Sequence, residues 1–370
     1  MINIKTILIL LVLTIISGLG YLYINNIDIS KDIVSPYITT QEQEQITAEP
    51  ESKFKKEEQK FGDIINILLI GNDTSEGRIQ RGQLGFNTDS MILVSINPIT
   101  NKVLLTSVPR DLWVNDNKIN ALYIVYGKEV LEDAFEKVTG QKVDATIMVN
   151  FDQFKWIVDS FGGVNTEIKT SFTDEQFPND TDSGPRPVSF TQGYQLMDGG
   201  RALDYSRSRK GNNGEGSDLK RAQRQHLILI GMLDSIQNSN SMYWPMDLDK
   251  FYNDITAQNI YTSLQLSDIY YLWDFYKDKD DYDIESFVID GKYVYHPGMY
   301  PESEYRAWVF VAKEPGFENL HKDITAKLNK TFVEEIELNE NEVIDQSNNT
   351  QSQQVLSDTV SKDQIVEIIE

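Results

Sequence analysis

Apolar and polar positions alternate along the chain in short blocks. The continuous apolar run Ile64–Ile70 is short enough to be a buried strand. Two more runs, Met91–Ile96 and Val103–Val108, flank the segment NPITNK, whose proline and asparagines suit a turn between paired strands. The pattern predicts further strands over Ala145–Val149 and Val164–Ile168.

Helical spacing falls between these strands. We predict helices over Glu129–Val138, ended by Gly140, and over Gln153–Phe161, closed by a glycine pair. A third helix is predicted from about Asp218, and Ala202–Ser206 is predicted as a strand. Strands alternating with helices indicate an α/β sheet with helices on its faces, and such sheets carry ligands on loops at strand ends.

The two ends of the chain differ from this globular part. Thr6–Ile24 has no charge over 19 residues, which is about the length that crosses a bilayer. We predict an uncleaved transmembrane anchor (6–24) after a short cytoplasmic start (1–5), so that the globular part is extracytoplasmic; a cleaved signal peptide is the alternative. Residues 25–61 are predicted as a polar linker, 62–335 as one domain, and 336–370 as an acidic, disordered tail.

Charge and composition exclude several classes of function. The chain has 57 acidic and 34 basic residues, a formal charge of -23, and no cysteine. A general nucleic-acid binder needs a basic surface, so we expect no nucleic-acid partner. The missing cysteine excludes disulfides, thiolate metal sites and a cysteine nucleophile. Because the chain is acidic overall, an anionic ligand would have to bind at a local basic patch.

Three polar residues lie where the predicted strands meet loops. Asp73 follows the first strand, Asp89 precedes the second, and Arg110 follows the third. Two carboxylates at loop positions suit magnesium, which completes its shell with phosphate oxygens and water. From the residues alone, turn or cap roles for both aspartates, and a surface pair of Arg110 with Asp111, remain open alternatives.

The segment from 201 to 225 holds five of the ten arginines of the chain. Arg207 and Arg209 would share one side of the predicted strand, and Arg221 and Gln225 share a helix face at i and i+4. Arginine forks beside a glycine-rich loop and a helix start indicate a phosphate site. A solvated basic face is the alternative.

The other motifs add little chemistry. The sequence has no GxxxxGK[ST], GxSxG or HExxH motif. His226 precedes the apolar run LILIGML and is predicted to be a packing or surface histidine rather than a base. That run belongs to the core or lines a lipid pocket. Arg201 and Arg224 are interpreted as ordinary surface charge.

A series of motifs carries a resemblance. They are NILLIGND, NTDSMILVSINP, LLTSVPRDLWV, KINALYIVYG, VDATIMVNFDQFKWIVDSFGGV, GYQLMDGGRALDYSRSRK and DLKRAQRQ. In this order, over about residues 62 to 330, the chain resembles the LytR-CpsA-Psr family of membrane-anchored enzymes. Members transfer glycopolymers, such as teichoic acids or capsular polysaccharides, from a polyprenyl diphosphate to peptidoglycan. The resemblance implies a three-layer α/β/α domain with a central mixed sheet, a lipid pocket, and magnesium or manganese.

The resemblance also implies roles for individual residues. Asp73 and Asp89 would hold the metal and, with Arg110, act in catalysis. The diphosphate would be bound by Arg207, Arg209, Arg221, Gln225 and Asn87. The family usually has an arginine where this chain has Asn87, so Arg78 or Arg81 is expected to supply that charge. Because of Asn87, a scaffold or regulator that binds the polyprenyl diphosphate without transfer remains the alternative function.

Overall fold

A mixed sheet of six strands forms the centre of the fold, in the order β11-β6-β1-β2-β3-β12. The computed structural model describes residues 61–82, 87–179, 184–297 and 308–330, which all belong to one compact unit. The strands pair antiparallel except at β1 with β6 and β3 with β12, which are parallel. Their bounds are β1 Ile65–Asn72, β2 Thr88–Asn97, β3 Lys102–Ser107, β6 Ala145–Val149, β11 Tyr261–Thr262 and β12 Asp283–Val288.

The sheet confirms the apolar runs of the sequence. Each run predicted as a core strand overlaps β1, β2, β3 or β6, and NPITNK joins β2 to β3 as an antiparallel turn. The strand predicted over Val164–Ile168 also forms, as β7, but it pairs with β10 (Gly193–Met197) in a separate two-stranded sheet. Its residues alternate between buried and exposed, as expected for a strand that is covered on one face.

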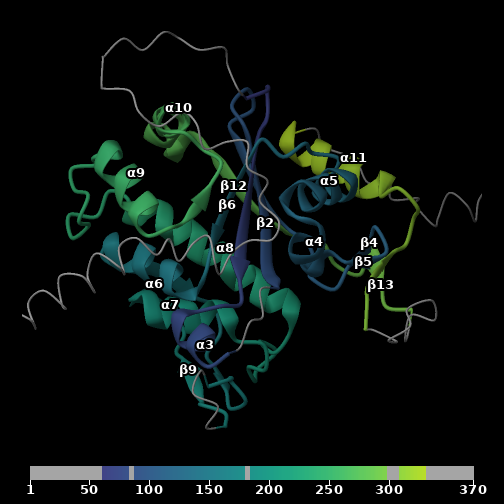
Figure 1. The fold of residues 1–370 in the computed structure, drawn as a ribbon, viewed down its shortest axis with the longest axis horizontal. Coiled ribbons are helices and arrows are strands. Elements are labelled where there is room, and N and C mark those ends of the chain that lie inside the picture. The colour runs from purple at the N-terminus through teal and green to yellow at the C-terminus, as the bar shows by residue number, and fades with distance from the viewer. Residues whose placement is uncertain (1–60, 83–86, 180–183, 298–307, 331–370) are drawn as a thin grey trace, which may run out of the picture. The chain divides into compact units, whose positions relative to one another are not determined.

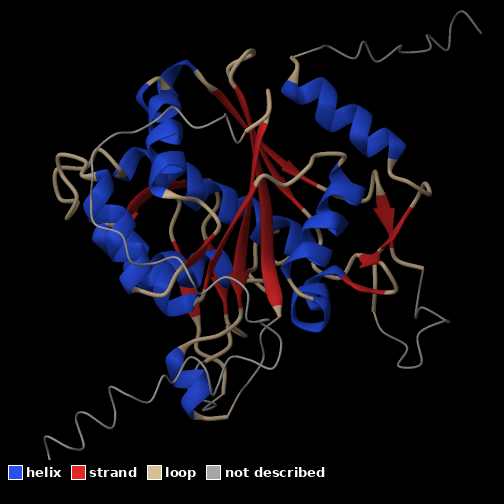
Figure 2. Cartoon of the chain, turned by 45° about the horizontal axis from the view of Figure 1, so that its top comes forward, coloured by secondary structure: helices blue, strands red, loops and turns tan. Residues whose placement is uncertain are grey.

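Helices cover both faces of the sheet, which gives the three layers visible in Figures 1 and 2. On one face α4 (Ile119–Tyr126), α5 (Lys128–Thr139) and α11 (Glu318–Leu328) pack on a core that includes Leu68 and Ile70. The other side carries α6 (Phe151–Ser160), α7 (Gly199–Arg207), α8 (Asp218–Ser235), α9 (Leu248–Ala257) and α10 (Leu266–Lys277).

Short elements complete the described part of the chain. They are α3 (Glu76–Gln80), the 3-10 turn η1 (Lys279–Asp281), and the two-stranded pairs β4 (Trp113–Val114) with β5 (Asn117–Lys118), β8 (Phe172–Asp174) with β9 (Val188–Phe190), and β13 (Val294–Tyr295) with β14 (Val311–Ala312).

The predicted helix ends are confirmed in α5 and α6. Gly140 ends α5 with φ 70°, a left-handed conformation that glycine adopts without strain. Asn150 caps α6 by accepting a hydrogen bond from the backbone N–H of Gln153, whose side chain bonds back to the N–H of Asn150. This capping box begins α6 two residues earlier than predicted.

The strand predicted over Ala202–Ser206 is wrong, because the segment is helix α7. The side chain of Asp198 accepts the backbone N–H of Arg201 at 2.7 Å and thereby caps the helix start. A segment of five residues is too short to distinguish the helical period from the strand period. The capping aspartate was the signal that could have identified the helix. Arg207 is therefore the last residue of a helix, and Arg209 lies in the loop that follows.

The termini lie outside the described residues. This applies to the predicted anchor at 6–24, to most of the linker and to the tail. Within the part of the chain that is described, none of the helices combines the length and the apolar character needed to cross a bilayer.

Candidate functional site

A cavity of about 480 Å³ lies between the sheet and helices α6, α7 and α8. Leu69 of β1 pairs with Ile92 of β2 and with Ile147 of β6, so the three side chains point to the same face and form the floor. The helices supply apolar walls, namely Phe154, Ile157 and Val158 of α6, Leu203 of α7, and Ile228, Leu229 and Met232 of α8. Part of the LILIGML run therefore lines a cavity.

One end of this cavity is polar because several element ends meet there. β1 ends beside the start of β2, with Gly71 opposite Ser90, and this places Asp73 and Asp89 at the same edge. The last turn of α7 and the first turns of α8 add cationic and amide side chains. Of the eight predicted site residues, six line the cavity: Asp73, Asp89, Arg207, Arg209, Arg221 and Gln225.

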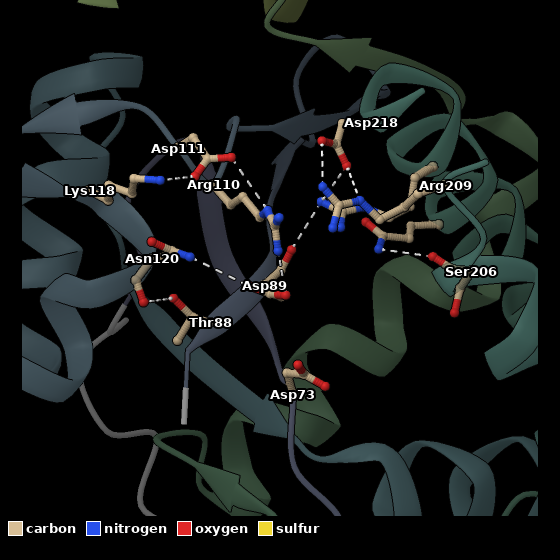
Figure 3. Close-up of polar contacts among 12 residues, drawn as sticks. Asp73, Thr88, Asp89, Arg110, Asp111, Lys118, Asn120, Ser206, Arg209 and Asp218 are labelled. Atoms are coloured by element: carbon tan, nitrogen blue, oxygen red, sulfur yellow. Dashed lines mark hydrogen bonds and ion pairs between the residues drawn. The ribbon is translucent and has the colours of Figure 1, made fainter. Parts of the chain in front are cut away.

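Arg110 reaches this polar end through Asp89. Its Nη1 donates to Asp89 Oδ2 at 2.6 Å, and Asn120 Nδ2 donates to Oδ1 at 3.4 Å (Figure 3). Arg110 Nε is 3.6 Å from Asp111 Oδ2, so the pair with Asp111 considered for a surface role is also present. With a side chain 20% exposed, Arg110 is nevertheless more than a surface residue.

Asp73 has a different environment from Asp89. It forms an ion pair with Arg78 of α3, whose side chain also lines the cavity. Burial raises the pKa of Asp73, and the nearby charge of Asp89 adds to the rise, against the opposing effect of Arg78. Two carboxylates that disfavour each other's charge fit a divalent cation that takes its other ligands from phosphate and water.

The described residues contain no cluster of three or more His, Cys, Asp or Glu side chains suited to a metal. A site that depends on Asp73 and Asp89 alone would hold a cation firmly only with a ligand in place. This is the arrangement expected for magnesium at phosphate sites. The donor set therefore fits magnesium that arrives with a diphosphate.

Two arginines of the polar end share one carboxylate. Asp218, the first residue of α8, accepts from Arg209 Nε at 2.8 Å and from Nη2 at 3.0 Å (Figure 3). Arg221 lies 3.4 Å from the same carboxylate and donates to the backbone carbonyl of Asp89 at 3.3 Å. Asp218 was missed from the sequence, although its i,i+3 spacing to Arg221 was a signal.

A donor remains at this end. The Nε atom of Arg221, a residue that lines the cavity, is buried and has no hydrogen-bond partner among the described residues. Buried donors without partners are uncommon in native proteins. Phosphate oxygens are acceptors that guanidinium groups bind well.

Arg207 is placed by aromatic rings. Its guanidinium carbon lies 4.1 Å from the centroid of the Phe151 ring and 5.4 Å from that of Phe177. Gln225 is held on both sides, since its Oε1 accepts from Ser90 Oγ at 3.0 Å and its Nε2 donates to the Ser206 carbonyl at 3.3 Å. These contacts fix where both side chains enter the cavity.

Asn87 and Arg81 do not join the lining. Asn87 is exposed, and its backbone carbonyl accepts from the N–H of Asp73 at 3.2 Å. Arg81 is also exposed, whereas Arg78 lies within the cavity lining. Of the two arginines expected to supply the missing charge, the structure brings Arg78 to the site.

Two further residues, His226 and Arg224, were given roles from the sequence. His226 is fully buried, with Ser107 Oγ 2.8 Å from Nε2 and Ser286 Oγ 2.5 Å from Nδ1, so it is a packing histidine. Burial lowers its pKa to about 4. Arg224 is not surface charge, because it is 2% exposed and bonded on all its nitrogens.

Comparisons with known proteins identify relatives of this chain. A polyisoprenyl-teichoic acid–peptidoglycan teichoic acid transferase, TagU of Oceanobacillus iheyensis, is 26% identical over 72% of this chain and 77% of its own length. The transferase TagV of Bacillus subtilis is 26% identical over 62% of this chain, which spans 58% of TagV.

The same fold has been solved. The structure described as TagT bound to LI-WTA matches with a TM-score of 0.53 and 25% identity, over 74% of this chain and 94% of that one. The model of the LytR-CpsA-Psr family matches residues 33–324. The central mixed sheet of an α/β fold is thus shared with solved relatives. The match covers most of the chain, and the protein therefore belongs to the LytR-CpsA-Psr family.

Proposed function

We propose that this protein transfers a glycopolymer from a polyprenyl diphosphate carrier to a hydroxyl group of peptidoglycan. The observation that carries the proposal is the cavity, which joins an apolar floor and walls to one end rich in arginine. A lipid diphosphate has the same division into an apolar chain and an anionic head. The names of the relatives, polyisoprenyl-teichoic acid–peptidoglycan transferases, support this substrate class.

The apolar part would hold the polyprenyl chain. Leu69, Ile92 and Ile147 offer a continuous apolar floor, and burial of the lipid against it is favourable by roughly 25 cal/mol per Å². The arginines at the polar end would bind the diphosphate. Guanidinium forks match phosphate oxygens in pairs, which favours arginine over lysine for this task.

In the proposed reaction a peptidoglycan hydroxyl oxygen attacks the phosphorus that carries the glycan. The bond from this phosphorus to the oxygen of polyprenyl phosphate breaks, polyprenyl phosphate leaves, and the glycan becomes joined through a phosphodiester. Phosphoryl transfer depends mainly on position and charge stabilisation. Arg207, Arg209 and Arg221 would hold the diphosphate and stabilise charge on the leaving group.

The carboxylates have two proposed tasks. Asp73 and Asp89 would hold magnesium or manganese, which would neutralise charge on the phosphate oxygens. One of the two would also accept the hydroxyl proton. Arg110 would orient Asp89 through their 2.6 Å contact.

The location proposed from the sequence fits this substrate. A polyprenyl carrier is embedded in a bilayer, and the uncharged run at residues 6–24 would keep the domain close to it on the extracytoplasmic side. We therefore propose a single-pass membrane protein with its globular domain outside the cytoplasm.

The direct test supplies the purified protein with a polyprenyl-diphosphate-linked glycan, magnesium and peptidoglycan. We expect released polyprenyl phosphate and glycan bound to peptidoglycan, both lost when EDTA is added or peptidoglycan is omitted. Tight binding of the lipid without release would instead support the scaffold or regulator.

A further inference from the structure

Ser208 separates the two arginines that follow one another in the sequence RSR, and it is completely buried. Its hydroxyl donates to Asp174 Oδ2 at 2.7 Å. Its carbonyl accepts from Arg224 Nη2, and its N–H donates to the Asp204 carbonyl at 3.1 Å. Every polar group of this residue is therefore used, between two arginines whose side chains reach the cavity.

Asp174 holds the backbone that follows. It is 1% exposed, and its Oδ2 also accepts the N–H groups of Arg209 at 3.1 Å and Lys210 at 3.0 Å. Burial alone would raise the pKa of Asp174, but hydrogen bonds from Ser208 and from these backbone groups outweigh it and lower the pKa. An ionised carboxylate thus fixes the turn that carries Arg209.

Arg224 holds the same segment from the opposite direction. It is 2% exposed, its Nε donates to the Tyr205 carbonyl at 3.0 Å, and its Nη1 forms an ion pair with Glu215 Oε2 at 2.9 Å. The carbonyls of Tyr205 and Ser208 belong to the C-terminal end of α7, which carries partial negative charge. Arg224 therefore provides hydrogen-bond donors to carbonyls at the helix end.

None of these three side chains lines the cavity. Their contacts are all to the protein, and removing one would leave a buried charge or polar group without its partner. A long arginine side chain loses conformational entropy when it binds a ligand, and this loss is smaller when its backbone is already fixed. Asp174, Ser208 and Arg224 fix the backbone that carries Arg207 and Arg209.

We propose that Asp174, Ser208 and Arg224 form a brace that positions Arg207 and Arg209 for the diphosphate. The inference rests on the proposed function, since it takes the diphosphate as the ligand of the two arginines. The brace acts through the arginines rather than by contact with the ligand. Its members are positioning residues.

The test is a double-mutant cycle with geranylgeranyl diphosphate as the probe, measured by calorimetry in magnesium buffer. We expect Ser208→Ala to weaken binding about tenfold, because small displacements of binding groups have large effects. In a protein that already carries Arg207→Ala and Arg209→Ala, Ser208→Ala should cause no further loss of affinity. The decrease in Tm caused by Ser208→Ala should be the same in both backgrounds.

Asp159→Ala is the matched control. Asp159 Oδ1 accepts the N–H of Gly199 at 2.7 Å, so this change removes a hydrogen bond at the other end of α7. It should lower Tm and leave the affinity unchanged. If Ser208→Ala does not fold, Asp174→Asn keeps the shape and removes the charge, and the same two outcomes apply.

The results separate the two hypotheses. Equal losses of affinity from Ser208→Ala in both backgrounds, or no loss in the wild-type background, would overturn the brace while leaving the proposed function intact. Wild-type protein that binds no better than the double arginine variant would overturn the proposed function, and the brace with it.

Discussion

Arg110 Nη1 lies 2.6 Å from Asp89 Oδ2, and this ion pair connects Arg110 to a carboxylate that lines the polar end of the cavity. Arg110→Ala should reduce the rate of polyprenyl phosphate release roughly 100-fold, a usual effect of losing one preorganised electrostatic group. The decrease should appear in kcat more than in KM, because Arg110 lies outside the cavity lining. Steady-state kinetics with the lipid-linked glycan checks this.

Arg186→Ala is the control for Arg110, since Arg186 pairs with Asp204 at 2.7 Å in an exposed position. It should leave both kinetic constants close to those of the wild type. A KM effect of Arg110→Ala with unchanged kcat would contradict a role through Asp89 and would indicate direct substrate contact.

Arg78 is predicted to bind the diphosphate. Arg78→Ala should weaken the binding of geranylgeranyl diphosphate by about 10- to 100-fold, the range for a lost charge-assisted hydrogen bond. Arg81→Ala removes the same charge from the end of the same short helix, outside the cavity lining, and should have little effect. Titration calorimetry on both variants decides between them, and equal losses would refute the assignment.

The cavity walls are predicted to select the lipid. Leu229→Phe adds bulk to the lining and should weaken binding of geranylgeranyl diphosphate about tenfold, because overpacking costs roughly 1–3 kcal/mol. Inorganic pyrophosphate should bind as before. Leu219→Phe, on the exposed part of the same helix, is the control. Parallel losses for both ligands would argue against a lipid cavity.

His226 should make stability depend on pH. Its pKa is about 4 in the folded protein, against 6.5 for an ordinary histidine, so between these values the unfolded chain binds more protons. The free energy of unfolding is therefore highest above pH 6.5. Titration of His226 lowers it by about 3 kcal/mol as the pH falls to 4. Urea unfolding of His226→Gln should lack this loss.

His321→Gln serves as the control for that series and should retain the full acid dependence. If His226→Gln loses the same stability as the wild type between pH 6.5 and 4, the buried histidine is not the source of it.

Much of the sheet could be predicted from the sequence because its strands are continuous apolar runs. Ala145–Val149 matches β6 at both ends, and the glycine stops of α5 and α6 follow from backbone conformation alone. These are local signals, and they need no knowledge of tertiary contacts. The strand prediction for Ala202–Ser206 was wrong because the segment is too short to show a clear period, and the capping residue Asp198 was not considered.

The candidate site could be predicted only in part. Asp73, Asp89, Arg207, Arg209, Arg221 and Gln225 do meet at one cavity. The interpretation of Arg224 as surface charge was wrong. Arg224 is buried by contacts with Glu215 and with the end of α7, and only the fold brings these segments together. Contacts between side chains of distant segments produce no periodic pattern in a sequence, so they cannot be predicted from it.

Arginines at the polar end are proposed to hold a diphosphate during transfer, and polyprenyl phosphate release by Arg207→Ala and Arg209→Ala tests this most directly. Each variant should stay folded, with a Tm near that of the wild type, and should release polyprenyl phosphate roughly 100- to 1,000-fold more slowly. Release at near-normal rates by both variants would contradict it.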